Sequence, residues 1–200
     1  MTKRYDRAYF DRWYRDPGSR LWTGAAVARK VRMVVGIAEH LLEGPVRSVL
    51  DVGCGEGSWQ RVLGRLRPAA RYRGIDSSEY AVRRFGRRRH IVFGEMGRLE
   101  ATRIRGYFDL VVCCDVLHYV PTADVRRGLA FMMERTGALA YLEAYAWGDT
   151  VDGDHRQFQR RSAATYRRLF REAGFSPVGL HCYVPTWKLA DLTRLESSGD

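Results

Sequence analysis

Apolar side chains in the first part of the chain recur three or four residues apart, which is the spacing of an amphipathic helix. Five aromatic residues follow this spacing between Tyr5 and Tyr14, and turn-forming residues at 16–18 then end the predicted helix. A second amphipathic helix is predicted over 23–42, before a Gly-Pro pair. The chain is therefore expected to begin with two helices.

From residue 46 onward, short apolar runs alternate with amphipathic segments. A repeating order of strand and helix requires a parallel sheet with helices on both faces, so we predict an α/β fold. Two β segments are predicted to close the chain, over 175–184 and 187–195. The other predicted strands cover 46–52, 72–76, 90–93, 108–114 and 138–145, and the predicted helices cover 58–66, 78–87, 123–135 and 162–173.

A glycine-rich turn follows the first predicted strand. The apolar run at 49–52 stops in the sequence Gly-Cys-Gly-Glu-Gly at 53–57. Glycines let the backbone reach positive φ angles and approach a bound cofactor without a Cβ in the way. Because Ser58 takes the last position of the dinucleotide fingerprint Gly-x-Gly-x-x-Gly, the spacing differs from that motif. The turn predicts a nucleotide-type cofactor of another kind.

Several segments, in order along the chain, resemble the motifs of class I S-adenosylmethionine-dependent methyltransferases. They are the glycine turn with the preceding Leu50-Asp51, the strand that ends in Asp76, the buried strand with its loop at 108–120, and Ala-Gly-Phe at 173–175. The resemblance covers 46–184 and implies a Rossmann-like seven-stranded sheet, mostly parallel, with an antiparallel last strand. It also implies an N-terminal helical lid over 1–45, a catalytic core over 46–200, and S-adenosylmethionine as the cofactor.

The resemblance assigns roles to particular residues. Asp51 would hold the glycine turn and the amino end of the cofactor, and Asp76 would accept hydrogen bonds from both ribose hydroxyls. Glu95 and Met96 would lie against the adenine, and Asp115 would shape the floor of the pocket. The cofactor-binding residues expected in this way are Asp51, Gly53, Cys54, Gly55, Asp76, Ser77, Glu95, Met96 and Asp115.

Methyl transfer is an in-line displacement that depends mainly on alignment, so a base is needed only for a weakly acidic hydroxyl or a protonated amine. His118 is the first candidate for that base because it follows the fourth strand and imidazole titrates near neutral pH. A pocket-lining role for His118 stays open. Tyr119 is the second candidate, and the alternatives are Glu143, Tyr145 and His155. The aromatic N-terminal segment is expected either to cover the acceptor or to pack in the core.

The chain has 200 residues and a net charge of +11, which raises the question of nucleic acid. Its densest basic cluster, at 83–89, holds one aromatic residue, so we interpret it as a solvated helix face. The loop after the fourth strand also lacks the Asn/Asp-Pro-Pro-Tyr/Phe signature of enzymes that methylate flipped bases. We therefore expect a small-molecule acceptor and no nucleic acid. An RNA or protein methyltransferase, or a non-catalytic cofactor-binding module, are the alternatives.

Composition predicts the cellular location of the protein and the redox state of its cysteines. No apolar run is long enough for a membrane span, and the N-terminus lacks an apolar signal core, so a cytoplasmic protein without membrane contact is expected. The four cysteines show no paired Cys-x-x-Cys spacing, which favours reduced thiols and no metal site. A monomer or a homodimer is expected.

Overall fold

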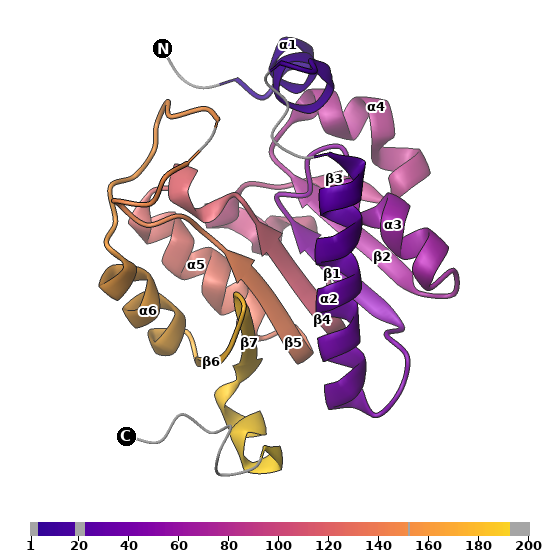
Figure 1. The fold of residues 1–200 in the computed structure, drawn as a ribbon, viewed down its shortest axis with the longest axis vertical. Helices are drawn as coiled ribbons and strands as arrows, with labels where there is room; N and C mark the ends of the chain where they lie inside the picture. Colours follow the sequence, from indigo (N-terminus) through magenta and orange to yellow (C-terminus); the bar gives the residue numbers. More distant parts are fainter. Residues whose placement is uncertain (1–3, 19–22, 152, 193–200) are drawn as a thin grey trace.

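The computed structural model describes residues 4–18, 23–151 and 153–192. Its centre is a seven-stranded sheet in the order β3-β2-β1-β4-β5-β7-β6 (Figure 1). β7 runs antiparallel to both of its neighbours, and the pairs among β1 to β5 are parallel. The strands are β1 (Ser48–Val52), β2 (Arg71–Asp76), β3 (Ile91–Phe93), β4 (Phe108–Cys114), β5 (Thr136–Glu143), β6 (Phe175–Gly179) and β7 (Cys182–Pro185). The α/β prediction is confirmed.

The order of the sheet reverses between β1 and β4, because the chain builds outward through β2 and β3 and then returns. Ligands in such sheets bind beyond the carboxyl ends of the strands at this reversal. The site residues predicted after β1, β2, β3 and β4 therefore meet at one edge of the sheet.

The predicted bounds of the last two strands were wrong, although the last strand is antiparallel as expected. The segment 175–184 is not one strand but two, β6 and β7, joined by a turn in which Leu180 and His181 both have positive φ angles. Non-glycine residues seldom adopt such angles, but Pro177 and Gly179, which has a φ of +99°, are turn signals just before them that the sequence analysis passed over. Residues Thr186–Asp191 form a 3₁₀ helix (η4) instead of a strand, and 193–195 lie outside the described residues.

The N-cap residue of three helices carries a hydroxyl side chain. The hydroxyl oxygens of Thr23, Ser78 and Ser162 each accept a hydrogen bond from the backbone N–H three residues on, which satisfies a donor that the helix leaves unpaired. The helices are α1 (Arg7–Phe10), the π-helical turn η1 (Asp11–Arg15), α2 (Gly24–Leu42), α3 (Ser58–Leu66), α4 (Glu79–Arg89), η2 (Met96–Thr102), η3 (Leu117–Tyr119), α5 (Thr122–Met133) and α6 (Ala163–Glu172).

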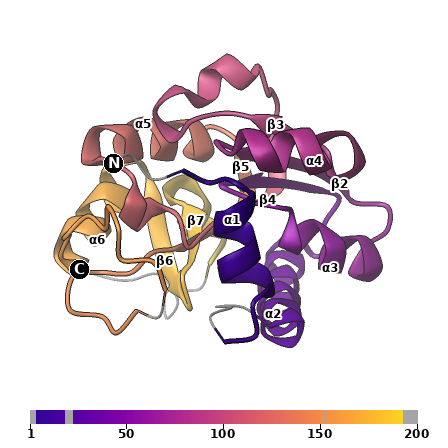
Figure 2. The ribbon, with the colours of Figure 1, turned by 90° about the horizontal axis from the view of Figure 1, so that it is seen from above.

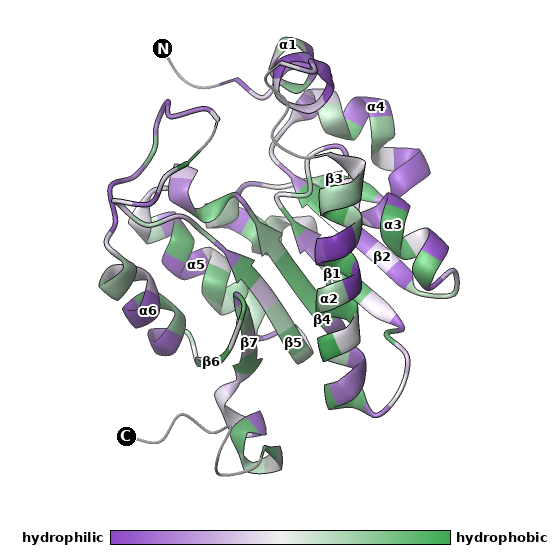
Figure 3. Ribbon diagram, in the orientation of Figure 1, coloured by the Kyte–Doolittle hydropathy of each residue, from purple (hydrophilic) through white to green (hydrophobic). Residues whose placement is uncertain are grey.

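Two apolar layers hold these elements together. One layer joins the sheet to α2 and α3, and the other joins it to η2, α5 and α6. β4, which lies between them, is hydrophobic along almost its whole length (Figure 3), as expected for a strand buried on both faces. No helix within the described residues has the length and apolar character to cross a membrane.

Candidate active site

A cavity of about 2270 Å³ opens at the carboxyl ends of β1, β2 and β4. Residues of α1 and η1 line it from above, and Figure 2 shows α1 lying across this end of the sheet. A site for one small ligand has a volume of roughly 300–1,000 Å³. The cavity therefore has room for two ligands at once.

The glycine turn forms part of the cavity wall. Gly53 and Gly55 have φ angles of +75° and +54°. A Cβ on Gly53 would lie 2.4 Å from a methyl group of Val116, and one on Gly55 would lie 2.9 Å from the Tyr14 hydroxyl. Both positions therefore require glycine. The side chain of Cys54 is buried against β2, so only the backbone of this residue is suited to meet a ligand.

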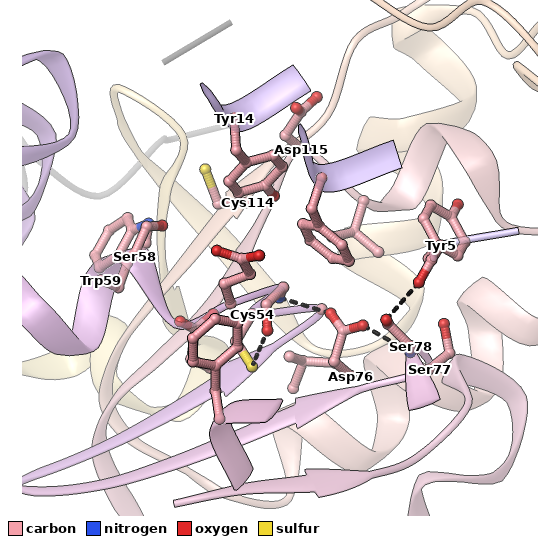
Figure 4. A pocket seen from close by; sticks show the side chains of 18 of the residues that line it. Tyr5, Tyr14, Cys54, Ser58, Trp59, Asp76, Ser77, Ser78, Cys114 and Asp115 are labelled. Atoms are coloured by element: carbon pink, nitrogen blue, oxygen red, sulfur yellow. Dashed lines mark hydrogen bonds between the residues drawn. The ribbon is translucent and has the colours of Figure 1, made fainter. Parts of the chain in front are cut away.

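Asp76 lies at the end of β2 and organises the loops around it (Figure 4). Its two carboxylate oxygens accept hydrogen bonds from the backbone N–H groups of Gly55, at 2.6 Å, and Ser78, at 2.8 Å. Burial raises the pKa of Asp76, and these two bonds oppose that shift. Each oxygen keeps a further lone pair, so the carboxylate fits a ribose with two neighbouring hydroxyls. Ser77 is exposed at the rim of the cavity.

Asp76→Ala is expected to weaken S-adenosylhomocysteine binding about 100-fold, the effect of losing a charge-assisted bidentate contact. Calorimetry on the folded variant measures this loss. Asp76→Asn is the size-matched companion and should bind with intermediate affinity. An unchanged dissociation constant in a cooperatively folded Asp76→Ala protein would show that the ribose does not lie on this carboxylate.

Asp51 is almost completely buried at the end of β1 and also lines the cavity. The Tyr72 hydroxyl donates a hydrogen bond to its carboxylate at 2.6 Å. Burial raises the pKa of Asp51 to about 7, although the bond from Tyr72 lowers it. Sequence analysis missed Tyr72, because a tyrosine inside a β strand is expected there for packing alone.

Asp51 gives the stability of the protein a pH dependence. Between about pH 4 and pH 7 the folded protein holds the Asp51 proton and the unfolded chain has lost it, so stability falls as the pH rises through this window. The loss amounts to at most about 4 kcal/mol. Urea unfolding at pH 5 and pH 8 should show a smaller fall for Asp51→Asn than for the wild type. Equal falls would contradict the raised pKa.

Glu95 and Met96 follow β3 and both line the cavity. Glu95 is exposed. The thioether of Met96 packs against α5, where a Cβ on Gly128 would lie 2.1 Å from its sulfur. Met96 therefore contacts the core on one side, and its place on the cavity wall is fixed by that packing.

Asp115 and His118 lie on the turn that follows β4. Asp115 lines the cavity and has a φ of +62°, an uncommon angle that is often found at functional sites. The His118 ring is completely buried, stacked on Phe158, and its Nδ1 accepts a bond from the Tyr145 N–H at 3.4 Å. Its Nε2 lies 3.2 Å from Asp115 Oδ1, in a contact that is not aligned as a hydrogen bond.

The structure does not bring His118 to the cavity surface. A base must come within hydrogen-bond reach of the proton that it removes. Of the two candidates predicted on this turn, Tyr119 lines the cavity and His118 lies behind Asp115. The His118 ring lies away from the cavity because its apolar surface packs among the rings of Tyr119, Tyr145 and Phe158.

The alternative bases also lie away from the cavity surface. Glu143 is buried at the end of β5, where Lys30, Cys114 and Tyr141 all donate to its carboxylate. Burial raises the pKa of Glu143, but these donors outweigh burial and lower it overall. Among the described residues that line the cavity are Lys30 and Cys114, but not Tyr145 or His155.

A buried arginine holds the turn that carries these residues. The Arg161 guanidinium donates to the backbone oxygens of Leu117 and Val120 and to the hydroxyl groups of Thr122 and Tyr166. Since the loop that contains Arg161 follows β5, this one side chain joins two loops above the sheet. No sequence signal identified Arg161, because half of its partners are backbone atoms.

The N-terminal segment is fastened to both sides of the glycine turn. The Ser78 hydroxyl donates to the Tyr5 carbonyl oxygen at 2.5 Å, and Arg15 contacts Glu56 at 2.5 Å. Between these two ties, Phe10 and Tyr14 pack edge to face with ring centroids 5.0 Å apart. The segment therefore covers the cavity from above.

Comparison with known proteins agrees with this geometry. Residues 50–137 match the family model of a methyltransferase domain. No curated protein sequence matches the chain. Among solved structures, an S-adenosylmethionine-dependent methyltransferase from Archaeoglobus fulgidus is similar with a TM-score of 0.64 and 13% identity, covering 86% of this chain and 75% of that one. At these identities the likeness to solved structures shows the fold.

Two further structures show the same fold. Magnesium protoporphyrin IX methyltransferase from Synechocystis PCC 6803, with bound S-adenosylhomocysteine, has a TM-score of 0.58 and 20% identity and covers 86% of each chain. An amino pentose methyltransferase from Micromonospora echinaspora, with bound S-adenosylmethionine, has a TM-score of 0.58 and 16% identity. That match covers 81% of this chain and 89% of the other.

Proposed function

We propose that this chain is a class I S-adenosylmethionine-dependent methyltransferase and that it moves a methyl group to an oxygen or nitrogen atom of a small molecule. The observation that carries the proposal is the meeting of the glycine turn with Asp76 at the reversal of the sheet, below a cavity with room for two ligands. Dinucleotide-binding sheets place a pyrophosphate at the same turn, but the glycine spacing differs here.

The residues around the cavity fit the cofactor. S-adenosylmethionine supplies a methyl group on a positively charged sulfur, which is an activated donor. The backbone of Gly53, Cys54 and Gly55 would approach its methionine part, Asp51 its amino end and Asp76 its ribose. Glu95 and Met96 would flank its adenine. Asp115 and Tyr119 would then face the acceptor, with His118 acting as a positioning residue through Asp115.

The N-terminal segment would act as a lid over both ligands. Its aromatic side chains would exclude water from the part of the cavity that they cover, and exclusion of water strengthens electrostatic contacts. The predicted boundary at residue 45 divides the sequence into this lid and the catalytic core. In packing, however, α2 belongs with the core because its apolar face is buried against the sheet and α3.

Two considerations support a small molecule as acceptor. Two of the similar structures are named for small-molecule acceptors, a magnesium porphyrin and an amino pentose. The cavity is also partly covered by the chain's own N-terminal segment, whereas an enzyme acting on a large polymer needs an open approach to its substrate. The predicted monomer or homodimer is compatible with this enclosed site.

The test uses methyl-labelled S-adenosylmethionine and a fractionated cell extract, with Gly53→Val as the inactive control. We expect label in the small-molecule fraction, resistant to nuclease and protease. Label that disappears with nuclease or protease treatment would instead identify an RNA or protein methyltransferase. Binding of the cofactor with no labelled fraction would identify a non-catalytic module.

A further inference from the structure

One hydroxyl group on the upper side of the cavity makes no hydrogen bond to the protein. Tyr14 belongs to η1, and its side chain is directed into the cavity (Figure 4). Its ring packs against Phe10, with centroids 5.0 Å apart, and Phe10 is itself buried. Within the part of the chain that the structure describes, the Tyr14 hydroxyl has no hydrogen-bond partner. The ring is therefore held in place while its polar end faces the cavity.

This hydroxyl lies directly over the glycine turn. It is 2.9 Å from the position that a Cβ on Gly55 would take. The next residue, Arg15, contacts Glu56 of the same turn at 2.5 Å. Two neighbouring side chains of η1 therefore meet the turn. The charge of Arg15 is taken up by Glu56, and the Tyr14 hydroxyl is left to meet a ligand.

The part of the turn that a ligand approaches has already used its own donors. The N–H groups of Gly53 and Cys54 both donate to the Ile75 carbonyl oxygen, at 2.8 and 3.1 Å. The N–H of Gly55 donates to Asp76. A ligand group that accepts hydrogen bonds above these residues therefore needs a donor from another element of the protein.

We propose that the Tyr14 hydroxyl donates a hydrogen bond to the carboxylate of the cofactor's methionine part. The inference rests on the proposed function and adds a binding residue from the N-terminal segment. If Asp76 holds the ribose and Asp51 the amino group, the carboxylate is the acceptor that remains above the turn. A tyrosine hydroxyl is neutral at pH 7 and can donate one hydrogen bond. A bond from it to a carboxylate is of the stronger, charge-assisted kind.

This contact links the N-terminal segment to the cofactor. A carboxylate that leaves water is costly to bury unless protein donors replace the water. The Tyr14 hydroxyl supplies such a donor only while η1 lies over the turn, where the contacts of Ser78 with Tyr5 and of Arg15 with Glu56 hold it. Cofactor binding should therefore stabilise the closed position of the segment.

The test compares two ligands that differ in this carboxylate alone, S-adenosylhomocysteine and its decarboxylated analogue S-adenosyl-3-thiopropylamine. Calorimetry measures binding of the first, and displacement of the first measures binding of the second. Tyr14→Phe removes the hydroxyl and keeps the ring. We expect it to weaken S-adenosylhomocysteine binding about tenfold or more and to leave the affinity for the analogue unchanged. Tyr107→Phe is the matched control and should change neither affinity, because Tyr107 is 71% exposed and does not line the cavity.

The outcomes separate this inference from the proposed function. A wild-type protein that binds neither ligand would refute the proposed function itself. If the wild type binds S-adenosylhomocysteine and Tyr14→Phe binds it equally well, only the inference fails. The inference also fails if the wild type binds both ligands equally, or if Tyr14→Phe weakens both by the same factor, because the hydroxyl then does not contact the carboxylate. Equal unfolding temperatures of the wild type and both variants exclude a folding defect as the cause.

Discussion

Gly53→Val is expected to abolish S-adenosylhomocysteine binding in calorimetry while the protein still unfolds in one cooperative transition. The valine Cβ would lie 2.4 Å from Val116, and the φ of +75° is unfavourable for a β-branched residue. The turn must therefore move from the position that allows close approach of a ligand. The cost in folding stability should be about 1–3 kcal/mol, because the clash is with Val116, a partly buried residue at the margin of one apolar layer.

Gly64→Val is the matched control for this change. Gly64 lies in α3, and the nearest atom to a Cβ built on it is 3.9 Å away. The same substitution there should leave cofactor affinity unchanged. If Gly53→Val still bound the ligand with normal affinity, the turn would not be the binding element, and the proposed cofactor site would be wrong.

His118→Asn is expected to lower turnover by roughly 10²-fold, the cost of a misplaced group in the site, and to leave cofactor affinity near normal. The effect on turnover is indirect, because the buried ring contacts Asp115 and the Tyr145 backbone and does not reach the cavity. Asparagine is shorter and cannot reach both partners, so Asp115 loses its support. Single-turnover methyl transfer with both substrates saturating measures the chemical step alone.

His40→Asn, on the exposed side of α2, is the control for the substitution itself. A folded His118→Asn protein with full turnover would remove His118 from the mechanism. A parallel loss of turnover and cofactor affinity would instead identify His118 as a residue that shapes the whole pocket. Thermal unfolding of both variants distinguishes either result from a loss of fold.

The order of strands and helices was predictable because the apolar residues of each core element follow one pattern along its whole length, either that of a helix or that of a strand. The buried strands β1, β4 and β5 are apolar runs bounded by turn residues, and both layers of helices show amphipathic spacing. At the end of the chain this logic was not applied to Pro177 and Gly179, the turn residues that mark the break between β6 and β7. The turn between them uses positive φ angles at Leu180 and His181, which propensity does not predict.

The parts of the site that depend on local sequence were predictable, and those that depend on tertiary packing were not. The places of Gly53 and Asp76 on the cavity wall were predictable because a turn and a strand end position them regardless of the rest of the chain. His118 also follows a strand, but whether its ring faces the cavity or the core depends on Phe158, a residue forty positions later. Tyr72 acts through one hydrogen bond to another strand, and Arg161 acts through four hydrogen bonds to other segments. No local pattern encodes such contacts.

The four hydrogen bonds of Arg161 make the loop after β5 and the turn after β4 a single mechanical unit. A cation buried in this way is costly once its partners are displaced. Attempts to broaden the acceptor range by grafting a different loop after β5 should therefore retain Arg161 together with its flanking residues. Grafts that omit it would disturb the turn at Asp115 even when they never touch the acceptor. Libraries restricted to point substitutions between Trp147 and Asp154 leave that unit intact and are the better starting material for directed evolution.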